Sequence, residues 1–154
     1  MTSGRLVVIA IISITILFGI GVWYASTRAY YVRLETVEIT LQRPDGTLLP
    51  LEMAGAEGID ADTSPLRFRA CFRVEPETVA SLLAAAMPYA EATPLLAPGW
   101  FDCFDADAIG EAIEAGEAQA ALGVRNISRG VDRVVALFPD GRAFAWNQLN
   151  GTLE

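Results

Sequence analysis

The side chains that could do chemistry in this 154-residue chain are its two cysteines and its nineteen acids. The chain has no histidine and no lysine, and all eleven basic residues are arginine. A histidine-dependent triad, a histidine-ligated zinc, a Schiff-base lysine and a phosphate-loop lysine are therefore excluded. What remains is cysteine redox chemistry and acid–base chemistry by pairs of carboxyl groups.

The two cysteines are Cys71 and Cys103, which lie 32 positions apart. Redox enzymes of the thioredoxin type place two residues between their cysteines, so this spacing does not predict redox catalysis. An isolated pair in a small domain is instead typical of one structural disulfide formed in an oxidising compartment. We therefore expect a Cys71–Cys103 disulfide bond and a domain outside the cytoplasm.

The acids form no recognisable catalytic or metal-binding motif. Asp60 and Asp62 begin a segment like a calcium loop, but Pro65 replaces the turn glycine and Cys71 replaces the last glutamate ligand. We expect no bound metal and no cofactor. Paired carboxyl groups hydrolyse glycosidic bonds where a cleft holds them at a fixed separation. A membrane-tethered hydrolase that uses Asp/Glu pairs is therefore the alternative to a noncatalytic protein.

Nine acids lie between residues 74 and 124, where the sequence has no basic residue. Three interpretations stay open: the acids cap and line an exposed helix, they pack over an arginine-bearing strand, or they form a docking surface for a basic protein. In the second interpretation a disulfide brings opposite charges together. That charged contact would involve three arginines and three aspartates, namely Arg67, Arg69, Arg73, Asp102, Asp105 and Asp107.

Hydrophobic spacing predicts the elements that position these residues, with alternation for strands and a period of 3.6 for helices. Pro-Asp-Gly at 44–46 and again at 139–141 predicts two hairpin turns. The expected elements are strands 31–42, 48–53 and 66–74, helices 76–87 and 106–122, and strands 131–138 and 142–149. The order is β-β-β-α-α-β-β in one α+β domain. Strand 66–74 should turn its apolar residues to the core and its arginines and Cys71 to the other face.

The N-terminal segment is apolar and uncharged. Sixteen of the twenty residues from 6 to 25 are apolar, and the first 34 residues include no acid. Twenty helical residues span about 30 Å, the thickness of the hydrocarbon core. We expect a short tail over 1–5, a transmembrane anchor over 6–27 with residues 6–25 in the lipid bilayer, and a soluble domain over 28–154. The run is longer than the apolar part of a cleaved signal peptide.

Two arguments disagree on the orientation of the anchor. One arginine precedes the helix and three follow it closely, which favours a cytoplasmic domain. The cysteine pair favours the opposite side. Because the charge rule is weak for one helix followed by a long domain, we expect the domain outside the cytoplasm.

Three stretches of the sequence contain distinctive motifs, at residues 59–72, 97–105 and 130–141. The motifs are Arg-Phe-Arg-Ala-Cys-Phe in the first stretch, Trp-Phe-Asp-Cys-Phe-Asp in the second, and Gly-Val-Asp-Arg-Val-Val followed by Pro-Asp-Gly in the third. Together they resemble a domain-of-unknown-function family of single-pass membrane proteins from alphaproteobacteria. The resemblance implies a bacterial inner-membrane anchor and a periplasmic domain, and it implies no activity.

The charge balance narrows the class of partner. The formal net charge of −8 disfavours nucleic acid, whose binders present a basic face. We expect the lipid bilayer as one partner and a protein of a membrane complex as another. The sequence thus predicts a noncatalytic accessory, assembly or interaction subunit rather than an enzyme.

Overall fold

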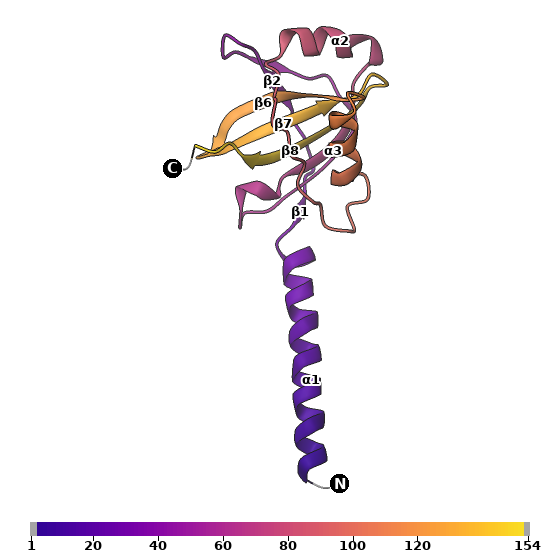
Figure 1. The fold of residues 1–154 in the computed structure, drawn as a ribbon, viewed down its shortest axis with the longest axis vertical. Coiled ribbons are helices and arrows are strands. Elements are labelled where there is room, and N and C mark those ends of the chain that lie inside the picture. The colour runs from indigo at the N-terminus through magenta and orange to yellow at the C-terminus, as the bar shows by residue number, and fades with distance from the viewer. Residues whose placement is uncertain (1–2, 153–154) are drawn as a thin grey trace. The chain divides into compact units, whose positions relative to one another are not determined.

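The computed structural model describes residues 3–152, so the first two residues of the expected N-terminal tail lie outside the described residues. The chain divides into two compact units between Tyr31 and Val32. The first unit is the helix α1 (Ser3–Tyr24), continued by a π-helical turn η1 (Ala25–Ala29) (Figure 1). Residues 3–5 of the expected tail are already helical.

The first unit is long and apolar enough to cross a membrane. Within Ser3–Ala29 an 18-residue window has a mean hydropathy of 2.7, and no residue of α1 is buried. The hydroxyl groups of Thr15, Ser26 and Thr27 donate to carbonyl oxygens one turn earlier. These polar groups are therefore satisfied within the helix, as a hydrocarbon environment demands.

The second unit is built on a six-stranded antiparallel sheet in the order β1-β4-β5-β8-β7-β6. Its strands are β1 (Val32–Arg33), β4 (Ala54–Asp60), β5 (Arg69–Arg73), β6 (Gln119–Ser128), β7 (Val131–Leu137) and β8 (Arg142–Leu149). A separate hairpin pairs β2 (Thr40–Gln42) with β3 (Leu48–Pro50). The helical segments are a 3-10 turn η2 (Pro65–Arg67), α2 (Pro76–Ala85) and α3 (Ala106–Glu114).

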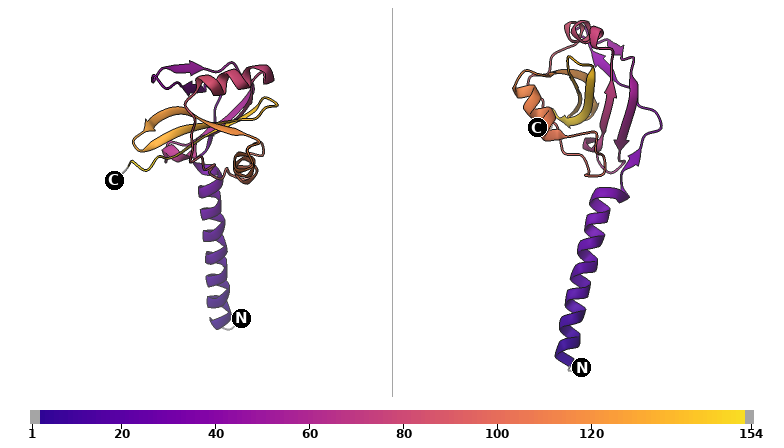
Figure 2. Two further views of the ribbon diagram at one scale, coloured as in Figure 1. Left: turned by 45° about the horizontal axis from the view of Figure 1, so that its top comes forward. Right: turned by 90° about the vertical axis from the view of Figure 1, so that its right-hand side faces the viewer.

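Both faces of the sheet are covered. On one face Phe72 of β5 and Leu137 of β7 belong to a hydrophobic core. This core also includes Ile39 just before β2, Leu41 in β2 and Val79 of α2. The opposite face carries the fully buried Trp146 of β8. Figure 2 shows the curved sheet with α2 at its end and α3 beside it. Because side chains alternate along each strand, the two faces hold different residues of the same strands.

The α+β class and both hairpins are confirmed, and the element order is richer than predicted. Strand 66–74 starts later, because Pro65–Arg67 forms the 3-10 turn η2. Strand 31–42 divides into β1 and β2 with a bend at Glu35, near the irregularity that its change of alternation suggests. The structure adds β4 and β6 as well.

The helix predicted over 106–122 is wrong in its second half. α3 ends at Glu114, Gly116 adopts a left-handed φ of 75°, and the chain enters β6 at Gln119. Alanines at 118, 120 and 121 favour a helix on intrinsic propensity, but pairing with β7 makes this segment a strand. Tertiary pairing therefore overrides the local preference.

Candidate functional site

The segment between α2 and α3, residues 86–105, is a long connection that we call the crossing loop. Its first part runs along the edge of β6, where Leu122 N donates to Met87 O at 2.8 Å and Tyr89 N donates to Ala120 O at 3.0 Å. From Tyr89 onward the crossing loop contacts side chains of β7, β8 and β5. A long loop inside a compact domain is commonly functional, so its attachments are the candidate site.

Four side chains on one sheet face hold the crossing loop: Asp132, Gln148, Arg69 and Cys71. Asp132 pairs with Gln148 across β7 and β8, and β5 pairs with β8 through Arg69↔Trp146 and Cys71↔Phe144. Residues that oppose each other across antiparallel strands share a face. The four side chains therefore belong to one polar row in an otherwise apolar layer, and we call them the fastening row.

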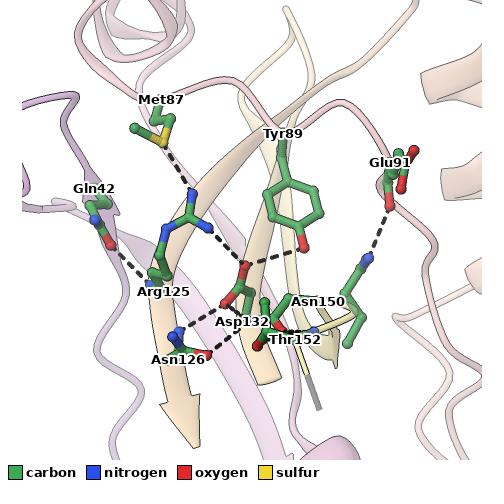
Figure 3. A network of polar contacts seen from close by, with 10 residues as sticks. Gln42, Met87, Tyr89, Glu91, Arg125, Asn126, Asp132, Asn150 and Thr152 are labelled. Carbon is green, nitrogen blue, oxygen red and sulfur yellow. Dashed lines mark hydrogen bonds and ion pairs between the residues drawn. The ribbon is translucent and has the colours of Figure 1, made fainter. Parts of the chain in front are cut away.

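Asp132 is the acidic residue of the fastening row, and 1% of its surface is exposed. Its Oδ1 accepts hydrogen bonds from Asn126 N at 2.8 Å and Asn150 Nδ2 at 2.7 Å (Figure 3). Its Oδ2 accepts a 3.3 Å bond from the Tyr89 hydroxyl and lies 3.9 Å from Arg125 Nη1. The carboxylate thus links β6, β7, the crossing loop and the residue after β8.

Asn126 reaches Asp132 through an unusual backbone conformation. Its φ of 49° is in the left-handed region, and the β6–β7 register shifts between Val124 and Ser128. Asparagine tolerates this conformation better than most residues that carry a side chain. The bulge therefore aims one backbone N–H at the buried carboxylate.

Tyr89 acts as a hydrogen-bond donor in this network. Burial raises the pKa of its hydroxyl, and the negative charge of Asp132 raises it further. A phenol with a raised pKa stays protonated at neutral pH, so it donates to Asp132 and does not serve as a base. A hollow of about 340 Å³ beside the network is lined by residues that include Tyr89, Glu91, Arg125 and Asn150.

Gln148 fastens the next part of the crossing loop. Its Oε1 accepts from Thr93 N at 2.8 Å and from Trp146 Nε1 at 2.9 Å, while its Nε2 donates to Glu91 O at 2.9 Å. The Gln148 amide therefore accepts from a loop N–H and from the indole N–H of the fully buried Trp146, and it donates to a loop carbonyl.

Arg69 fastens the middle of the crossing loop. Its Nε donates to Leu95 O at 2.7 Å and its Nη2 donates to Leu96 O at 3.0 Å. Its Nη1 donates to the carbonyls of Leu66 and Phe68 at 2.7 and 2.6 Å. The side chain is 3% exposed, so a buried guanidinium is surrounded by carbonyl oxygens from two segments.

The predicted disulfide is formed. Cys71 of β5 bonds Cys103 at the end of the crossing loop, with the Cα atoms 6.2 Å apart. Next to it, the Phe104 ring makes edge contacts with Phe144 and Trp146 at centroid distances of 6.1 and 6.3 Å. The bond therefore attaches the segment just before α3 to the centre of the sheet.

The residues of the expected charged contact, three arginines and three aspartates, lie in different surroundings. The four hydrogen bonds of Arg69 given above go to carbonyl oxygens of the crossing loop and of residues 66–68. Asp105 Oδ1 accepts from Ala108 N at 3.1 Å and caps α3. Asp102 and Asp107 are exposed, and so is Arg73, while Arg67 is half-buried. The charged contact among these six residues stays a prediction.

A second polar cluster lies on the opposite face. Arg133 Nε donates to Asn147 Oδ1 at 3.0 Å, and its guanidinium lies over the Phe68 ring at 3.6 Å. Asn147 Nδ2 donates to Pro65 O at 2.7 Å. Burial lowers the pKa of Arg133 to about 10, against an opposing effect of Asp60. This cluster connects β7 and β8 to η2.

Sequence reasoning missed Asp132, Gln148 and Asn147 as members of these clusters. Each is a polar residue inside a largely apolar strand, and each is less than a tenth exposed. That interruption was the available signal, because a buried polar side chain needs partners. Alternation alone does not say which segment supplies them. Within residues 3–152, no group of three or more Cys, Asp or Glu residues is placed to hold a metal ion.

Comparison with known proteins gives one match. The model of a family described as a family of unknown function (DUF6446) matches residues 37–154, which lie in the second unit. No curated protein matches the chain. No solved structure matches it either.

Proposed function

We propose that this chain, which belongs to a family of unknown function (DUF6446), is a single-pass membrane protein whose domain is a noncatalytic accessory, assembly or interaction subunit of a membrane complex. The observation that carries the proposal is the fastening row. The residue types that could do chemistry, a buried carboxylate, a buried guanidinium and the cysteine pair, are used inside the domain to hold the crossing loop.

A catalytic acid or base must reach the proton that it transfers. Asp132 has two N–H donors on one carboxylate oxygen and a hydroxyl donor on the other, and it is 1% exposed. Such a carboxylate stabilises the fold and is poorly placed to touch a substrate. The groups left for function are those on the surface, which favours binding over catalysis.

The surface of residues 74–124 supports an acidic docking site. All nine acids of this stretch are exposed, and the stretch contains no arginine. They are Glu75, Glu77, Glu91, Asp102, Asp105, Asp107, Glu111, Glu114 and Glu117. Complementary charge speeds encounter and selects partners, so the proposed partner presents a basic surface.

The proposed location is the bacterial inner membrane with the domain in the periplasm. The apolar helix supports the membrane, because it is long enough to cross one. The Cys71–Cys103 bond supports the periplasm, since disulfides persist in oxidising compartments. The motif resemblance supports the bacterial setting.

Affinity purification of the full chain from membranes in mild detergent, with cross-linking and mass spectrometry, tests the proposal. We expect the same protein to co-purify in repeated preparations. Changing Glu111, Glu114 and Glu117 together to Gln should remove it, and the matched variant with Glu35, Glu38 and Glu52 changed to Gln should retain it. Repeated recovery of the intact chain alone would contradict the subunit role.

The alternative, a membrane-tethered hydrolase, has one observation in its favour. Glu52 and Glu75 line two adjoining hollows of about 330 and 280 Å³. A general acid of this kind normally sits in an apolar pocket that raises its pKa, whereas both glutamates are exposed. We therefore place this function second. Hydrolysis of a glycoside panel by the full chain, lost in Glu52→Gln and Glu75→Gln, would reverse the order.

A further inference from the structure

The disulfide opens onto a surface hollow. Cys71 and Cys103 both line a hollow of about 500 Å³, and its charged lining residues are Arg73, Arg142 and Glu57. The two cysteines differ in access. Cys71 is 8% exposed, between its partners on β4 and β8, whereas Cys103 is exposed on the crossing loop.

Access decides which sulfur an external thiolate attacks. Both cysteines line the hollow, but Cys71 is a buried residue of the sheet and Cys103 is an exposed residue of the crossing loop. The first bond to an incoming thiol should therefore form at Cys103, and Cys71 should be the leaving group.

The surroundings of Cys71 stabilise the leaving thiolate. Arg73 is two residues further along β5, so it projects from the same face, and it pairs in register with Arg142 of β8. Arg142 Nε lies 2.7 Å from Asp140 Oδ2, and Glu57 lies 3.7 Å from Arg33 Nη1. Asp140 also interacts with Arg73, more weakly than with Arg142. Arg73 lies on the same strand face as Cys71 and lines the same hollow, so it is the guanidinium proposed to favour a thiolate at Cys71.

We propose that Cys71–Cys103 is a thiol-exchange site for a dithiol reductant protein, with Cys103 Sγ as the sulfur that is attacked. The reductant's thiolate forms a bond to Cys103 Sγ, the Cys71–Cys103 bond breaks, and its electron pair stays on Cys71 Sγ. The second thiol of the reductant, as thiolate, then attacks its own sulfur of the mixed disulfide and releases Cys103 as a thiolate. The reductant ends as a disulfide, and the chain gains two electrons and, from water, two protons.

Reduction would free only one end of the crossing loop. Tyr89, Glu91, Thr93, Leu95 and Leu96 keep their bonds to the fastening row, because none of these involves sulfur. The segment from 97 to 105 loses its covalent attachment, and α3 with its acids follows directly. Reduction thereby removes one attachment next to the acidic helix, whose Ala106, Ile109 and Ala112 stay packed against the domain.

The test uses the oxidised full chain in detergent with reduced glutathione as the attacking thiol. The reaction is quenched early with acid, free thiols are alkylated, and peptides are mapped by mass spectrometry. We expect glutathione on Cys103 and the alkyl group on Cys71, in roughly tenfold excess over the reverse pattern. Glutathione mainly on Cys71, equal labelling of both sulfurs, or reaction only after unfolding would overturn the proposal.

The contribution of Arg73 is tested by rate. Arg73→Gln should slow the second-order reaction with glutathione by roughly three- to tenfold, because the leaving thiolate loses its guanidinium. Arg129→Gln is the matched control, since Arg129 is an exposed arginine in the turn between β6 and β7. Equal rates in the two variants would remove Arg73 from the site.

Discussion

Arg69 of β5 donates from Nε to the carbonyl oxygen of Leu95 at 2.7 Å, which joins the middle of the sheet to the middle of the crossing loop. Irregular loop backbone that covers a sheet face must find hydrogen-bond partners there. The guanidinium supplies several donors in a fixed planar arrangement, so one side chain satisfies carbonyls of two segments. One arginine side chain thus supplies the hydrogen-bond donors that the edge of a neighbouring strand would otherwise supply.

Arg69→Met should therefore destabilise the domain strongly. The side chain keeps much of its volume, but four carbonyl oxygens lose a donor in one buried and three part-buried hydrogen bonds. We expect a loss of about 3 kcal/mol or more in the free energy of unfolding, measured by denaturant titration of the full chain in detergent with tryptophan fluorescence.

Arg129→Met is the control for this change, because Arg129 is exposed and its loss should stay within about 0.5 kcal/mol. A similar small effect for Arg69→Met would show that water replaces the guanidinium at the carbonyls, and that the other attachments of the loop are sufficient to hold it.

Asp132→Asn tests the other end of the fastening row. The amide has the shape of the carboxyl group, but it places an NH₂ where donors from Asn126, Asn150 and Tyr89 converge. If the amide oxygen keeps the two N–H donors, its NH₂ faces the Tyr89 hydroxyl, which must then accept, and the Arg125 guanidinium loses an opposite charge. We expect a loss of about 2 kcal/mol in unfolding free energy by the same titration, against a change near zero for the exposed Asp62→Asn.

Sequence pattern predicted what depends on local alternation and turn chemistry. The β5 segment separates Ala70 and Phe72 from Arg69 and Cys71, as its alternation requires. Both Pro-Asp-Gly turns connect the expected strands. The disulfide followed from cysteine count alone, since two cysteines allow one pairing.

The rest depends on contacts between distant segments. β4 contains Ala54, Gly55, Ala56 and Gly58, which give little strand signal, and it forms because β5 offers an edge. Gln148 meets residues more than 50 positions away in the crossing loop. Spacing within a segment holds no information on such partners, so the fastening row was visible only as unexplained polar residues in strands.

Alkaline titration should single out Tyr89. Burial and Asp132 raise the pKa of its hydroxyl above the usual 10.0. An acid whose pKa is higher in the folded state contributes stability that is fully present below the unfolded pKa of about 10 and is lost as pH rises through the folded pKa. As pH rises above about 10, we expect the unfolding free energy of Tyr89→Phe to fall less than that of the unchanged chain.

The other three tyrosines, at positions 24, 30 and 31, lie in the first unit. Tyr30→Phe therefore serves as the control, and its stability should fall with pH as in the unchanged chain. Tyrosinate absorbance gives an independent reading, because the signal missing from Tyr89→Phe should titrate above the usual tyrosine pKa of 10.0. An early titrating signal at Tyr89 would contradict the network in which it donates to Asp132.

The two Pro-Asp-Gly turns provide a matched pair for a glycine test. Gly46 and Gly141 have nearly equal φ values of 85° and 86°, so alanine is strained by a similar amount at each. A Cβ at Gly46 meets nothing within 4 Å, whereas a Cβ at Gly141 would collide with the carbonyl oxygen of Val74. We expect Gly46→Ala to cost about 1 kcal/mol of unfolding free energy, and Gly141→Ala at least about 2 kcal/mol more. Val74 N also donates to Gly141 O at 2.9 Å, so a hydrogen bond joins the second turn to the residue after β5. Denaturant titration of the two variants side by side cancels the shared strain. Equal losses would show that the second turn moves away from Val74 without cost, and that its contact with β5 does not stabilise the sheet.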